Sequence, residues 1–233
     1  LGWGTHERHF PADGARHEAG CGSAIYLMRP GASTRVRTWT PLAGTIHGFL
    51  ITHSESISIS DYYTVKGADG GAAYRPTVHY AYHPCDDAVL SLHELAGKNW
   101  HMQDSQRLMM DEIKSGVDEL GVLLMGHERG AYWFGSRLSI DEARRLVPYN
   151  NATSLQVTVA VLAGMVWALE NPRAGLVEPE ELDHDRIMAI ARPYLGEVVG
   201  VYSDWTPLLD RGLLFPEPVE RGCPWQFQNF RVS

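Results

Sequence analysis

The sequence predicts an α+β fold, with a mixed, largely antiparallel sheet of about six or seven strands and helices on one face. Short runs rich in β-branched and aromatic residues fill the first half of the chain. Glycine and proline separate these runs, and helical spacing dominates much of the second half. The chain has 233 residues, enough to bury a substantial core, and we expect one domain over residues 1–233.

The strands are expected to follow an irregular lead-in over residues 1–20. They cover residues 24–28, 34–39, 48–52, 56–65, 73–83, 119–126, 131–138 and 197–202. In residues 56–60, serine and isoleucine alternate strictly, which predicts a strand with its isoleucines on one face. The glycine-rich residues 67–71 lie between two runs and predict a hairpin turn.

Helical spacing begins after Pro84, with Asp86 and Asp87 at the start of the helix and Gly97 at its end. Further helices are expected at residues 139–146, which open with a capping-box pattern, at 152–170 and at 179–191. Residues 152–169 carry no charge and approach the length of a membrane span. Polar side chains in their first half favour a buried helix of a soluble protein, so we expect no membrane partner.

The charge balance concerns possible partners. The chain has 28 acidic against 20 basic residues and a net charge of −8, which argues against a nucleic-acid partner and suits a cationic ligand. Three widely spaced cysteines indicate a reducing compartment, and the N-terminal residues carry no secretory pattern, so we expect a cytoplasmic protein.

Two familiar kinds of site are not predicted. The sequence contains no GxGxxG turn, and so no dinucleotide fingerprint of its own. His79, His83 and Cys85 have a spacing that could build a metal site, but no convincing fourth ligand accompanies them. We therefore expect no metal.

His53 and Glu55 are the strongest candidates for proton chemistry. On an extended backbone, side chains two residues apart project to the same side. An imidazole beside a carboxylate could relay a proton, and the carboxylate could hold an ammonium ion. A polar pair on a solvated turn explains the same spacing, and the residues themselves leave both interpretations open.

Several sequence segments together resemble the family of bacterial homospermidine synthases, which is related to the saccharopine dehydrogenases. These segments are residues 1–7, 19–22, 34–39, 79–94, 161–172, 204–208 and 224–227. The similarity runs over essentially the whole chain. It implies that this chain is the substrate-binding and dimerisation domain of a longer enzyme, whose N-terminal Rossmann domain holds NAD and is absent here.

The resemblance implies an activity and partners. Putrescine is oxidised to an imine, ammonia leaves, a second putrescine adds, and the returning hydride gives homospermidine. Putrescine and related diamines are therefore the expected ligands, a homodimer is the expected assembly, and the chain by itself is expected to be inactive. The implied site residues are His53 and Glu55 for catalysis, Tyr80, His83, Asp86 and Asp87 for substrate, and Asn151 and Thr153 for the cofactor.

Two alternatives stay open. One is a carboxynorspermidine or saccharopine dehydrogenase type of enzyme, in which Arg35, Arg37 and Arg75 could clamp a substrate carboxylate. The other is a non-catalytic module whose sheet builds a dimer interface.

Overall fold

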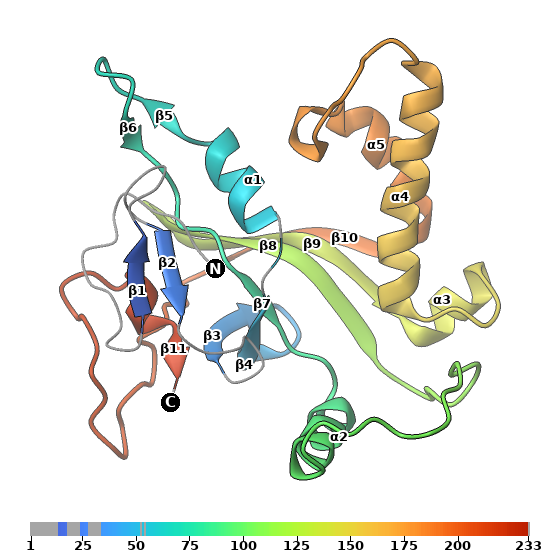
Figure 1. Cartoon of the computed structure of the whole chain (residues 1–233), viewed down its shortest axis with the longest axis horizontal. Coiled ribbons are helices and arrows are strands. Elements are labelled where there is room, and N and C mark those ends of the chain that lie inside the picture. Colours follow the sequence, from blue (N-terminus) through green and yellow to red (C-terminus); the bar gives the residue numbers. More distant parts are fainter. Residues whose placement is uncertain (1–13, 18–23, 28–33, 52, 54, 233) are drawn as a thin grey trace. The chain divides into compact units, whose positions relative to one another are not determined.

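The computed structural model describes residues 14–17, 24–27, 34–51, 53 and 55–232 (Figure 1). The contacts group the chain into two compact units, where the sequence predicts one domain. The first unit comprises residues 1–101 and 204–233, and the second comprises residues 102–203. Most of the predicted lead-in lies outside the described residues. Its residues 14–17, however, form a strand rather than irregular chain.

The first unit is built on a four-stranded antiparallel sheet in the order β11-β3-β4-β7. Its strands are β11 (Arg231–Val232), β3 (Arg35–Thr40), β4 (Gly44–Ile51) and β7 (Tyr80–Tyr82). Two hairpins accompany it, β1 (Gly14–His17) with β2 (Ala24–Leu27), and β5 (Val65–Lys66) with β6 (Ala72–Tyr74). The helices are α1 (Glu55–Tyr62), α2 (Asp86–Gly97) and the 3₁₀ turn η4 (Phe227–Asn229).

The segment 56–65 is the clearest correction to the sequence prediction. It forms the helix α1 rather than a strand. In a helix, residues four apart share a face, so Ser56 and Ser60 are buried together while Ile57 is exposed. The Ser60 hydroxyl donates a 3.0 Å hydrogen bond to the Pro76 carbonyl. Tertiary contacts that suit small serines therefore override the alternating pattern.

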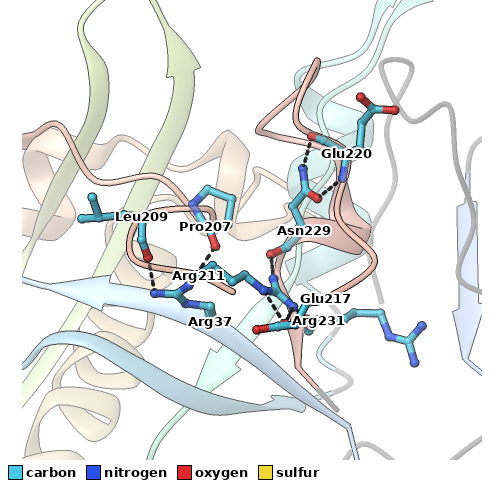
Figure 2. Close-up of polar contacts among 8 residues, drawn as sticks. All are labelled: Arg37, Pro207, Leu209, Arg211, Glu217, Glu220, Asn229 and Arg231. Atoms are coloured by element: carbon cyan, nitrogen blue, oxygen red, sulfur yellow. Dashed lines mark hydrogen bonds and ion pairs between the residues drawn. The ribbon is translucent and has the colours of Figure 1, made fainter. Parts of the chain in front are cut away.

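The C-terminal segment returns to the edge of this sheet and is held there by arginines (Figure 2). The buried Arg37 of β3 donates hydrogen bonds to the Pro207 carbonyl at 3.2 Å and the Leu209 carbonyl at 2.8 Å. Arg211 pairs with Glu217 and donates to the carbonyls of Asn229 and Arg231. These contacts close the loop that precedes β11.

Asn229 is the second anchor of this segment and is completely buried. Its amide group donates to the carbonyls of Glu220, Cys223 and Pro224 at 2.9–3.0 Å, and its oxygen accepts from the Glu220 N–H at 2.8 Å. One side chain thus contacts four backbone groups of a loop that has little regular structure of its own, with its two N–H donors shared among three carbonyls.

The second unit contains a three-stranded antiparallel sheet in the order β10-β9-β8. Its strands are β8 (Val117–His127), β9 (Gly130–Ser139) and β10 (Glu197–Ser203). Gly121 and Gly135 face each other across β8 and β9, and the buried indole of Trp133 lies against both. A side chain at either glycine would occupy the space that this ring fills.

Two helices of the second unit lie at the predicted positions, whereas the helix predicted over residues 179–191 is divided into a short 3₁₀ turn and a helix that begins at His184. The helices are α3 (Ile140–Leu146), α4 (Ala152–Glu170) and α5 (His184–Ala191), with 3₁₀ turns η2 (Pro179–Glu181) and η3 (Arg192–Tyr194). The Ser139 hydroxyl accepts from the Glu142 N–H at 3.1 Å, which confirms the predicted cap. The helix α4 is long and apolar enough to cross a membrane, and it packs against α3, α5, β8 and β9.

The α+β class and the antiparallel pairing are confirmed. The arrangement of the strands differs from the prediction, because among the described residues they form sheets of two, three, four and two strands rather than one sheet of six or seven. Strand runs can be predicted from local residue patterns, but their grouping depends on contacts between residues far apart in the sequence.

Candidate active site

His53 and Glu55 meet where β4 leads into α1. The His53 carbonyl accepts a 3.1 Å hydrogen bond from the Ser56 N–H, which opens the helix. The His53 Nδ1 atom contacts the Glu55 carboxylate directly. The two side chains are 45% and 48% exposed, so the pair is accessible from solvent. The structure therefore forms the contact that the spacing predicts, although a helix and not a strand presents Glu55.

Tyr80 of β7 completes this group. Its ring lies parallel to the His53 imidazole, with ring centroids 4.9 Å apart and an interplanar angle of 16°. The Tyr82 ring follows at 6.5 Å from Tyr80 in a tilted arrangement. The family resemblance implies that Tyr80 is a substrate residue, but the sequence carries no signal for this stack, because the stack depends on the register between β4 and β7.

His83, Asp86 and Asp87 lie between the end of β7 and the first turn of α2. The His83 Nε2 atom lies 3.7 Å from the Asp86 carboxylate, and both aspartates are exposed. Acidic side chains are favourable at this end of a helix, so local stability already explains their position. The same exposed carboxylates are chemically suited to hold an ammonium group.

Asn151 and Thr153 belong to the second unit, at the start of α4. The Asn151 side chain caps the helix by accepting from the Ser154 N–H at 2.8 Å. The Thr153 hydroxyl donates to the Asp118 carboxylate. The described contacts therefore give both residues a structural role.

His79, His83 and Cys85 have a spacing that could build a metal site, but among the described residues no group of three or more His, Cys, Asp or Glu side chains could hold an ion. His79 packs edge-on against Phe227 and Phe230, at 5.4 and 5.3 Å between ring centroids. Burial lowers the pKa of His79 to about 4, which keeps this imidazole neutral at physiological pH.

The arginines of the carboxylate-clamp alternative are engaged elsewhere. Arg37 is buried on the backbone carbonyls of the C-terminal segment. Arg35 bonds His93 at 3.2 Å, and Arg75 pairs with Asp61 at 2.9 Å. Their contacts give no support to a substrate carboxylate site built from these three residues.

A family match decides what kind of chain this is. Residues 1–202 match the saccharopine dehydrogenase C-terminal domain. The chain belongs to this family. The family assignment agrees with the α+β architecture, and the resemblance found in the sequence is confirmed.

Two similar proteins are homospermidine synthases. A homospermidine synthase of Blastochloris viridis is 60% identical over 232 residues, covering 100% of this chain and 49% of the relative. A homospermidine synthase of Mesorhizobium japonicum is 56% identical over 233 residues, covering 100% of this chain and 48% of the relative. The chain therefore spans about half the length of the curated relatives it matches.

A similar solved structure is also a homospermidine synthase. The crystal structure of homospermidine synthase from Legionella pneumophila in complex with NAD superposes with a TM-score of 0.93 at 57% identity. The match covers 100% of this chain and 50% of that chain.

Proposed function

We propose that this chain is the substrate-binding part of an NAD-dependent homospermidine synthase. The observation that carries the proposal is the 56–60% identity to two homospermidine synthases over the whole of this chain. The reaction joins two putrescine molecules into homospermidine and releases one ammonia. It is redox-neutral, because the hydride removed in the first step returns in the last.

NAD would supply the hydride acceptor and donor. The sequence offers no GxGxxG turn, and its glycine-rich residues 67–71 join β5 to β6 in a hairpin. We therefore assign most of the cofactor contacts to polypeptide beyond this chain. Asn151 and Thr153 remain candidates for a contact with the cofactor, alongside the structural roles that their hydrogen bonds describe.

The residues of this chain are assigned proton and charge roles. The His53 imidazole exchanges a proton with the substrate nitrogen, and Glu55 fixes the imidazole through Nδ1. Within the part of the chain that the structure describes, Nε2 of His53 has no hydrogen-bond partner, so this atom is the one left to meet a substrate. His83, Asp86 and Asp87 would line the diamine site, where carboxylates attract ammonium groups.

The test uses the full-length protein supplied with NAD and putrescine, with homospermidine and ammonia measured by mass spectrometry and an enzymatic assay. His53→Gln is expected to lower kcat about 100-fold or more, as loss of a general acid–base does. His184→Gln is the matched control, because His184 also lies beside a carboxylate, Asp185, but is 88% exposed in the other unit. Unchanged turnover in His53→Gln would contradict the assignment.

We further propose a homodimer in the cytoplasm. Val122, Leu124 and Tyr202 are exposed, and the strand register places them on one face of the β8–β10 sheet with Phe134. A second copy of the chain would bury this apolar face. The free thiols of Cys85 and Cys223 agree with a reducing compartment.

Light scattering of the full-length protein tests the dimer. A Val122→Asp, Phe134→Asp double variant is expected to run as a monomer, while Leu176→Asp, at a 97% exposed loop position, leaves the dimer intact. A dimer that persists in the double variant would refute this interface.

A further inference from the structure

The His53 imidazole is held by two contacts of different kinds. The contact between Nδ1 and the Glu55 carboxylate fixes one edge of the ring. The Tyr80 ring, parallel at 4.9 Å between centroids, fixes the plane. A hydrogen bond to one nitrogen still lets the imidazole rock about that bond, whereas a stacked neighbour restricts the rocking. Together the two contacts define where Nε2 lies.

The stack follows from strand register rather than from local sequence. Tyr80 is the cross-strand partner of Ile51, two residues before His53. Directly opposed residues of an antiparallel pair project to the same face, so Tyr80 emerges on the side of Ile51. The neighbouring His79 packs instead against Phe227 and Phe230 of the C-terminal segment. These contacts anchor the chain immediately before Tyr80.

The need for such a contact is physical. The His53 side chain is 45% exposed and would otherwise sample several rotamers. Proton transfer requires a nitrogen within hydrogen-bond reach of the reacting atom, and a misplacement of about 1 Å can cost about 100-fold in rate. The face of Tyr80 that covers His53 is, in turn, closed to a cationic ligand, which would need that face for a cation–π contact.

We propose that Tyr80 is a positioning residue, which holds the imidazole plane of His53 so that Nε2 meets the substrate nitrogen. This role rests on the proposed function of His53. It differs from direct substrate binding, because Tyr80 then contributes to turnover only through His53. Its aromatic ring carries the effect, and its hydroxyl does not.

The experiment is a double-mutant cycle on the full-length protein with NAD and putrescine. The variants are Tyr80→Phe, Tyr80→Leu, His53→Gln and the combination Tyr80→Leu, His53→Gln. Tyr80→Val serves as a second ring-free variant, suited to a strand, if the leucine protein fails to fold. Tyr74→Leu is the matched control, because Tyr74 is an exposed strand tyrosine on β6. Thermal midpoints are measured for every variant.

The expected result has three parts. Tyr80→Phe keeps kcat within about 3-fold, because the stacked ring remains. Tyr80→Leu lowers kcat about 10- to 100-fold with little change in KM, as loss of orientation predicts. In the His53→Gln background the same change has little further effect, because groups that act as a unit are not additive.

Two results would overturn the proposal. One is a raised KM with unchanged kcat in Tyr80→Leu or Tyr80→Val, which assigns Tyr80 to substrate binding. The other is an additive loss in the combined variant, which shows that Tyr80 acts independently of His53. Failure of the underlying function looks different: His53→Gln by itself would then leave turnover unchanged.

Discussion

His79 is a half-buried histidine of the first unit, and its titration has a consequence for stability. Its ring packs edge-on against Phe227 and Phe230, and desolvation lowers its pKa to about 4. In the unfolded chain the same imidazole titrates near its ordinary value of about 6.5. Between these two values the unfolded state binds more protons than the folded state. Acid therefore favours unfolding in this range.

The predicted effect is a loss of stability as the pH falls from about 6.5 to about 4, at up to about 1.4 kcal/mol per pH unit from this group. His79→Phe is expected to remove this part of the pH dependence, because phenylalanine preserves an aromatic contact and cannot be protonated. Urea denaturation of both proteins at pH 7 and pH 5 measures it. Equal losses of stability in the two proteins would show that His79 is not the source.

For single residues, contacts between near neighbours in the sequence can be predicted, whereas contacts between distant residues cannot. The contact between His53 and Glu55 follows from a separation of two residues and is found. The stack of Tyr80 on His53 joins residues 27 positions apart, and it exists because Tyr80 pairs with Ile51. A single sequence carries no measure of that register.

Among the elements, the glycine pair of β8 and β9 gives the sharpest test of packing. A Cβ at Gly121 would lie 2.5 Å from a Trp133 ring carbon, and one at Gly135 would lie 2.4 Å from the Gly121 Cα. Either glycine-to-alanine change is expected to destabilise the protein by about 1–3 kcal/mol, because the buried indole and the paired backbone have no room to move. Chemical denaturation measures the change.

Gly164 provides the control for this prediction. It lies inside α4, and a Cβ there meets nothing within 4 Å. Gly164→Ala is therefore expected to stabilise the helix by up to about 1 kcal/mol, the difference in helix propensity. Equal effects of the alanine changes at Gly121 and Gly164 would mean that the Trp133 contact does not constrain the sheet.

The loop before β11 depends on Arg211, whose side chain is 6% exposed. Its guanidinium pairs with Glu217 at 2.6 Å and bonds two backbone carbonyls of the closing turn. Arg211→Met is expected to cost about 3 kcal/mol, because it leaves two part-buried carbonyls and a carboxylate without their donor. Arg186→Met is the control, since its pair with Glu170 is far more exposed and should change the unfolding midpoint much less. A similar loss in both variants would argue against the clamp.

Among the helices, some are predicted correctly from the sequence pattern and others are not. Long helices with clear caps, such as α4 behind Asn151, are predicted almost to the residue. The short helix α1 is mistaken for a strand, because alternation of serine and isoleucine over five residues fits both structures. Its burial of Ser56 and Ser60 is decided by neighbours such as Pro76 rather than by its own composition.

At the scale of the whole molecule, the family resemblance predicts more about the chain than the local residue patterns do. The α+β class follows from strand and helix runs, but the division into two compact units does not, because residues 204–233 return to the first unit. The return is made by Arg37, Arg211 and Asn229, which have no local signature as anchors. The chain spans about half the length of the curated relatives it matches.

The most direct measurement is homospermidine formation from putrescine and NAD by the full-length protein, compared with the isolated 233-residue chain under the same conditions. We expect product and bound NAD for the full-length protein, loss of product in His53→Gln, and neither product nor retained NAD for the isolated chain. Homospermidine made by the isolated chain, or none made by the full-length protein, would contradict this expectation.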